Sequence, residues 1–164
     1  MTTTGDPRGG TPSGVSASLA LVVGFVGFAA LGILGLGMLS YFADIDILSA
    51  PGLGWRPGVV GMLVAIGVFC GALRPSLRRG DPSFLTAFPV ALGAAAAHLL
   101  AVWLTALLIG AGTASAFAAA AQLIVRGSST VVLAAAAIGA WVAIALRRTR
   151  VGAPRWPWED DDAQ

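Results

Sequence analysis

The sequence predicts an all-α membrane protein: a bundle of four transmembrane helices with both termini in the cytoplasm. Hydrophobic residues make up 57% of the 164 residues and charged residues only 11%, whereas about 25% of a soluble domain is charged. Residues 82–125 carry no charged side chain, and three further uncharged stretches cover residues 9–43, 57–73 and 127–146. Such runs predict membrane helices, because a helix pairs its own backbone N–H and C=O groups where lipid offers no partners.

The first two spans are predicted from where the apolar runs begin and end. Residues 1–15 are rich in Gly, Thr, Pro and Ser, and we expect a disordered cytoplasmic tail there. The helix at 16–42 is longer than the 7–15 apolar residues of a signal-peptide core, so we expect it to be retained. A second helix is expected at 57–73, since proline suits its first position and the Arg-Pro pair at 74–75 should end it.

The second half of the chain predicts two more spans separated by a short apolar helix. The third span is expected at 84–110, with its first turns bent by Pro89. The fourth is expected at 128–146, capped by the hydroxyl groups of residues 128–130. Residues 113–125 would form a helix of about 20 Å, too short to cross a bilayer. That helix lies along the interface or forms a re-entrant half-helix, and composition leaves both open.

The distribution of arginine predicts the orientation. All ten basic residues are Arg. Four spans with the N-terminus inside place eight of them in cytoplasmic segments and only Arg56 and Arg126 outside. Short basic loops resist translocation, so both termini are expected in the cytoplasm and the protein in the plasma (inner) membrane. The clustered Arg side chains are also expected to contact anionic lipid headgroups. Although the isoelectric point is about 9.5, the net charge is only +2, so we expect no nucleic-acid partner.

His98, the only histidine, lies near the middle of the third predicted span. Ionisable residues at that depth are candidate functional groups. Thr105, seven residues later, is the only polar residue of the same helix on that face. The alternative, which we favour, is a neutral imidazole that bonds to a Ser, Thr or carbonyl group of another helix.

The sequence lacks the residues that several kinds of catalytic or cofactor site require. Haem held between two histidines needs a second histidine, and a thiol–disulfide site needs a partner for Cys70. No carboxylate lies within a predicted span, no cluster of metal-ligating residues is visible, and a P-loop would need a lysine. We therefore expect no catalytic, cofactor-binding or metal-binding residues, and a protein that is not an enzyme.

Small residues spaced four apart predict close helix–helix contacts. Packing inside one bundle is favoured over homodimerisation, although homo-oligomers remain an alternative. The pairs that match the pattern are Gly67 with Gly71, Gly93 with Ala97, and Ala20 with Gly24.

The C-terminal tail, residues 147–164, combines Arg, Trp and acidic side chains. Arg155, Trp156 and Trp158 form its candidate motif. Arginine and tryptophan favour the membrane interface, but they are also frequent anchors of protein–protein contacts. Interface anchoring and docking of a cytoplasmic protein partner are both consistent with the sequence.

The tail also carries a resemblance. Residues 154–159 read PRWPWE and are followed by acidic residues. In this ending, and in its length and layout, the chain resembles small four-helix membrane proteins of actinobacteria that form a family with a domain of unknown function. The resemblance implies the topology and a bacterial origin, and it implies no activity.

Taken together, these patterns favour a non-enzymatic scaffold or accessory subunit that acts through helix packing and its C-terminal tail. The alternative is a small oligomeric transporter or channel subunit in which His98 lines a polar path.

Overall fold

The computed structural model describes residues 15–43, 54–79, 81–110 and 112–149. Within these ranges all regular structure is helical. The helices, in chain order, are α1 (Ala17–Ala43), α2 (Arg56–Arg78), the 3₁₀ turn η1 (Phe84–Thr86), α3 (Ala87–Leu108), α4 (Thr113–Val125) and α5 (Ser128–Arg148).

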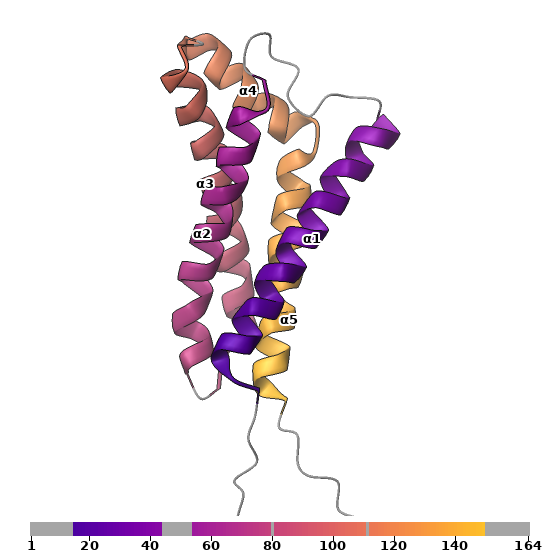
Figure 1. Cartoon of the computed structure of the whole chain (residues 1–164), viewed down its shortest axis with the longest axis vertical. Coiled ribbons are helices and arrows are strands. Elements are labelled where there is room, and N and C mark those ends of the chain that lie inside the picture. The colour runs from indigo at the N-terminus through magenta and orange to yellow at the C-terminus, as the bar shows by residue number, and fades with distance from the viewer. Residues whose placement is uncertain (1–14, 44–53, 80, 111, 150–164) are drawn as a thin grey trace, which may run out of the picture.

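Four of the described helices are long and apolar enough to cross a membrane, which confirms the predicted number of long apolar helices. They alternate in direction, so that α1 begins, α2 ends and α5 ends at the lower end of the bundle in Figure 1. The most extensive contacts join α2 to α3 and α1 to α5. The short helix α4 runs obliquely near the upper end, from the end of α3 to the start of α5 (Figure 1).

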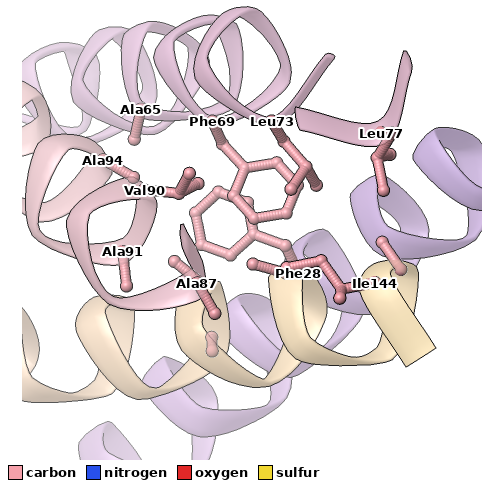
Figure 2. Packing of buried hydrophobic residues seen from close by; sticks show 14 of the residues in the cluster. Phe28, Ala65, Phe69, Leu73, Leu77, Ala87, Val90, Ala91, Ala94 and Ile144 are labelled. Carbon is pink, nitrogen blue, oxygen red and sulfur yellow. The ribbon is translucent and has the colours of Figure 1, made fainter. Parts of the chain in front are cut away.

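A single main core lies between the four long helices. Its largest members are aromatic and branched side chains, and the rings of Phe28 and Phe69 pack at an interplanar angle of 31° with centroids 4.9 Å apart. Figure 2 shows these two rings at the centre of the cluster, with Leu73 beside them and alanines of α3 nearby. Since alanine is short, α3 can approach its neighbours closely, and the Phe and Leu side chains of α1 and α2 fill the space between the helices.

Close helix crossings occur at glycines, but not at the pair that we expected on α2. A Cβ atom added to Gly139 of α5 would lie 2.8 Å from the carbonyl oxygen of Gly24 on α1. By contrast, Gly67 and Gly71 are exposed, and an added Cβ would meet no atom within 4 Å. The prediction that these two glycines pack inside the bundle is therefore wrong.

The other two predicted pairs of small residues differ in how closely they contact another helix. A Cβ on Gly93 would make only an ordinary contact, 3.8 Å from Val68, and Ala97 is half-buried. Ala20 is fully buried in the main core, and Gly24 lies at the α1–α5 crossing. Of the three pairs, the one on α1 therefore faces another helix most closely.

The end of α2 also differs from the prediction. The helix continues through Pro75 to Arg78 instead of ending at residue 73. Pro75 removes one backbone hydrogen bond, but the added turn buries Ser76 and Leu77 against the bundle. Burial of a leucine side chain contributes about 1.5–3 kcal/mol, which offsets much of that loss.

One expectation about helix starts is corrected, and one stays a prediction. Pro89 is the third residue of α3, directly after the 3₁₀ turn η1. A proline fits there because that backbone nitrogen has no partner within the helix, and the bend expected at Pro89 stays a prediction. At α5, Gly127 is the residue that precedes the helix, with φ +81°, and no side chain caps it. The hydroxyls of Ser128 and Ser129 are buried without a hydrogen-bond partner in the described chain, so the predicted capping role of these serines is wrong.

Candidate functional site

The intramembrane site predicted around His98 lies at the contact between α3 and α2. The imidazole is only 4% exposed. It rests against the backbone of Gly61, where an added Cβ would lie 3.0 Å from His98 Cδ2 and 3.2 Å from Nε2. Because Gly61 has no side chain, α2 can approach the ring directly. Nδ1 is buried and has no hydrogen-bond partner among the described residues.

Thr105 does not extend this site into a polar path. Its hydroxyl donates a 2.7 Å hydrogen bond to the carbonyl of Ala101, one turn earlier on α3. That bond lies within a single helix and occupies the one proton of the hydroxyl. His98 and Thr105 are also about 10 Å apart along the helix axis.

Two further buried polar side chains lie on α3 and α4, and the sequence did not point to them. Gln122 Oε1 on α4 and Trp103 Nε1 on α3 are both buried without a described partner, and the Trp103 ring packs on Phe117 with centroids 5.5 Å apart. The signal that marks Gln122 is its position as the single amide side chain of an uncharged stretch. No described hydrogen bond joins these groups into a network with His98.

The lower end of the bundle carries an arginine contact of a different kind. Arg147 donates from Nε to the carbonyl of Leu77 and from Nη1 to the carbonyl of Val15, each at 3.0 Å. Carbonyls in the last turn of a helix lack partners within that helix, so Arg147 supplies the missing donor to α2. One side chain thereby joins the end of α5, the end of α2 and the segment that enters α1.

The neighbouring Arg148 makes more exposed contacts. Its Nε lies 3.3 Å from Asp81 Oδ1, with side-chain exposures of 42% and 79%. Its guanidinium also lies 5.0 Å from the centre of the Phe84 ring, which packs on Trp141 at 5.7 Å. The exposure of both charges predicts only a weak ion pair.

Three further arginines at this end remain exposed, namely Arg74, Arg78 and Arg79. None of their side chains makes a hydrogen bond or ion pair with a residue that the structure describes. Their charges are therefore available to a ligand, a lipid headgroup or a partner.

The other residues considered in the sequence form no functional site within the described residues. Cys70 is half-buried and free, and the described part of the chain holds no group of three potential metal ligands. The tail motif of Arg155, Trp156 and Trp158, like the N-terminal tail, lies outside the described residues.

Comparisons with models of protein families, with curated proteins and with solved structures find no match to this chain.

Proposed function

We propose that this protein is a non-enzymatic, multi-pass protein of the plasma membrane that serves as a scaffold or accessory subunit. The observation that supports this role most directly is the environment of His98. His98, an ionisable side chain in the middle of α3, packs against a glycine backbone, and Thr105 of the same helix face bonds within its own helix. A conducting or transporting site needs polar groups that face a shared path, whereas a scaffold needs only tight packing.

The proposed topology has both termini and the α2–α3 connection in the cytoplasm. In the described residues, Arg74, Arg78, Arg79, Arg147 and Arg148 belong to one end of the bundle (Figure 1). Arg56 begins α2 and Arg126 follows α4, at the other end. This separation supports the positive-inside orientation.

The scaffold proposal is tested through the tail. Trp156→Ala combined with Trp158→Ala should remove a protein that co-purifies with the tagged chain from native membranes, while the bundle stays inserted. Trp141→Ala is the matched control, because it removes an exposed tryptophan of the bundle without changing the tail. Unchanged co-purifying proteins, with both variants at normal membrane levels, would contradict docking through the tail and leave interface anchoring as its role.

A small oligomeric transporter or channel subunit is the second candidate. The observation that favours it is the unpartnered Nδ1 of His98, because buried polar groups normally have a hydrogen-bond partner. The exposed Gly67 and Gly71 would then supply a contact between copies. A transporter predicts that His98→Gln is folded and inactive, and a scaffold predicts that it remains functional.

A further inference from the structure

An open groove lies between α1 and α2 near the arginine-rich end. Its volume is about 360 Å³, within the range of small-ligand sites, and its walls come from one turn of each helix. The lining residues are Ser18, Leu21 and Val22 on α1 and Cys70, Gly71 and Arg74 on α2.

The chemistry of this groove changes along its length. Leu21 and Val22 make its wall apolar, whereas Ser18 and Arg74 place a hydroxyl and a positive charge at its end. Arg74 lies one turn before the end of α2, a position from which a long basic side chain reaches the membrane interface. The side chains of Ser18 and Arg74 make no hydrogen bond or ion pair with a described residue. The groove therefore pairs an apolar surface with a free anion-binding group at headgroup depth.

We propose that this groove binds one anionic phospholipid, with its phosphate on Arg74 and Ser18 and an acyl chain along Leu21, Val22 and Gly71. The arginine fork matches two phosphate oxygens, and the hydroxyl of Ser18 donates to the same group. Gly71 leaves room for the chain, since an added Cβ there would meet no atom within 4 Å. The two helices that form the groove are predicted spans, so its occupant comes from the bilayer itself.

Paired variants separate this site from general attraction to basic residues. Arg74→Gln removes the charge in the groove, and Arg79→Gln removes an exposed charge at the same end that does not line it. Gly71→Leu fills the groove, and Gly67→Leu adds the same side chain one turn away on α2, outside the groove. Both glycines have open space at Cβ, so both leucine variants should fold, which circular dichroism checks.

The measurement is lipid binding to the purified full-length protein in detergent, by native mass spectrometry and by the lipid-induced rise in Tm. We expect phosphatidylglycerol to bind more tightly than phosphatidylcholine. Arg74→Gln should weaken phosphatidylglycerol about tenfold, as expected for the loss of a charge-assisted contact. It should weaken phosphatidylcholine less, because the choline group of that lipid offsets the charge of its phosphate. Gly71→Leu should weaken both lipids, whereas Arg79→Gln and Gly67→Leu should match the wild type.

Three results would overturn the proposal. Equal losses in Arg74→Gln and Arg79→Gln would mean that diffuse charge attracts the lipid. Displacement of phosphatidylglycerol by an equal concentration of glycerol 3-phosphate would mean a site for free phosphate. Tighter lipid binding after deletion of residues 150–164 would mean that the acidic tail of the chain itself occupies the groove.

Discussion

His98 on α3 contacts α2, and Arg147 on α5 contacts both α2 and the segment that enters α1. For His98 we predict that replacement by Gln is nearly neutral, because a charged imidazolium at mid-bilayer is costly and a hydrogen bond between membrane helices averages under about 1 kcal/mol. Replacement by Leu should cost little more. Thermal unfolding in detergent and complementation of a deletion strain are the two measurements.

A control for His98 lies on the same helix. Thr105→Val removes a hydroxyl whose described bond stays within α3, and it should also be neutral. A well-folded but inactive His98→Gln protein, with a phenotype that depends on pH, would instead support the transporter.

We predict that Arg147 contributes measurably to the free energy of unfolding of the protein. Arg147→Gln removes two charge-assisted hydrogen bonds to the carbonyls of Leu77 and Val15, so we expect a loss of about 1–3 kcal/mol in the free energy of unfolding. The neighbouring Arg148→Gln removes an exposed ion pair and the contact of the guanidinium with the Phe84 ring. Because both contacts are exposed, it should cost less, about 1 kcal/mol. Denaturant unfolding of both variants checks this, and equal losses would contradict the role assigned to Arg147.

At the scale of elements, the contact of α1 with α5 depends on the absence of side chains where the two helices cross. Gly139→Ala would place Cβ 2.8 Å from the Gly24 carbonyl and 3.1 Å from the backbone nitrogen of Phe28. Backbone atoms cannot move aside as a flexible side chain can, so we expect a loss of about 1–3 kcal/mol and weaker association of α1.

The matched control is Gly27→Ala on α1, where an added Cβ meets nothing within 4 Å. Alanine favours helix over glycine, so this variant should be as stable as the wild type or more so. Thermal unfolding monitored by circular dichroism compares the two. A Gly139→Ala protein as stable as Gly27→Ala would show that the crossing tolerates a wider separation.

The two ends of α2 illustrate what local sequence predicts about an element. Pro57 occupies the first turn as expected, because proline needs no N–H there. Pro75 did not end the helix, although the same residue type usually does. The difference lies in Leu77, which is fully buried in the core, and a local pattern carries no information about which neighbour will cover a residue.

At the scale of the whole molecule, the arginine distribution predicts which end of the helix bundle faces the cytoplasm. In a background with Cys70 replaced by Ala, a cysteine at Ser83 should resist an impermeant maleimide in intact cells, and a cysteine at the exposed Ser115 of α4 should react. Both should react after the cells are permeabilised. Labelling at position 83 in intact cells would reverse the proposed orientation.

The sequence predicted which residues of α3 belong to the candidate site, but it did not predict the contacts that they make. The sequence placed His98 in the middle of a span and Thr105 on the same helix face, and both lie on α3. It could not show that His98 meets Gly61 or that Thr105 bonds to Ala101, since the first depends on the approach of α2 and the second on a side-chain rotamer. The sequence also could not show the groove beside Arg74. Its walls come from two different helices, and Val22 of α1 and Gly71 of α2 are 49 residues apart in the chain.

By itself, the sequence determined the class of the protein, the number of long apolar helices and the clustering of arginines at their ends, because hydropathy, helix length and charge are properties of each segment alone. Only the tertiary structure decided which glycines lie at helix crossings, how far α2 extends and which polar groups have partners. In lipid every exposed helix face is apolar, so hydrophobic periodicity does not distinguish the packed face from the lipid-facing one. That choice depends on the fit between helices. In this bundle Gly24, Gly61 and Gly139 are among the glycines that lie close to another helix, while Gly67 and Gly71, which have the same spacing of small residues, are exposed.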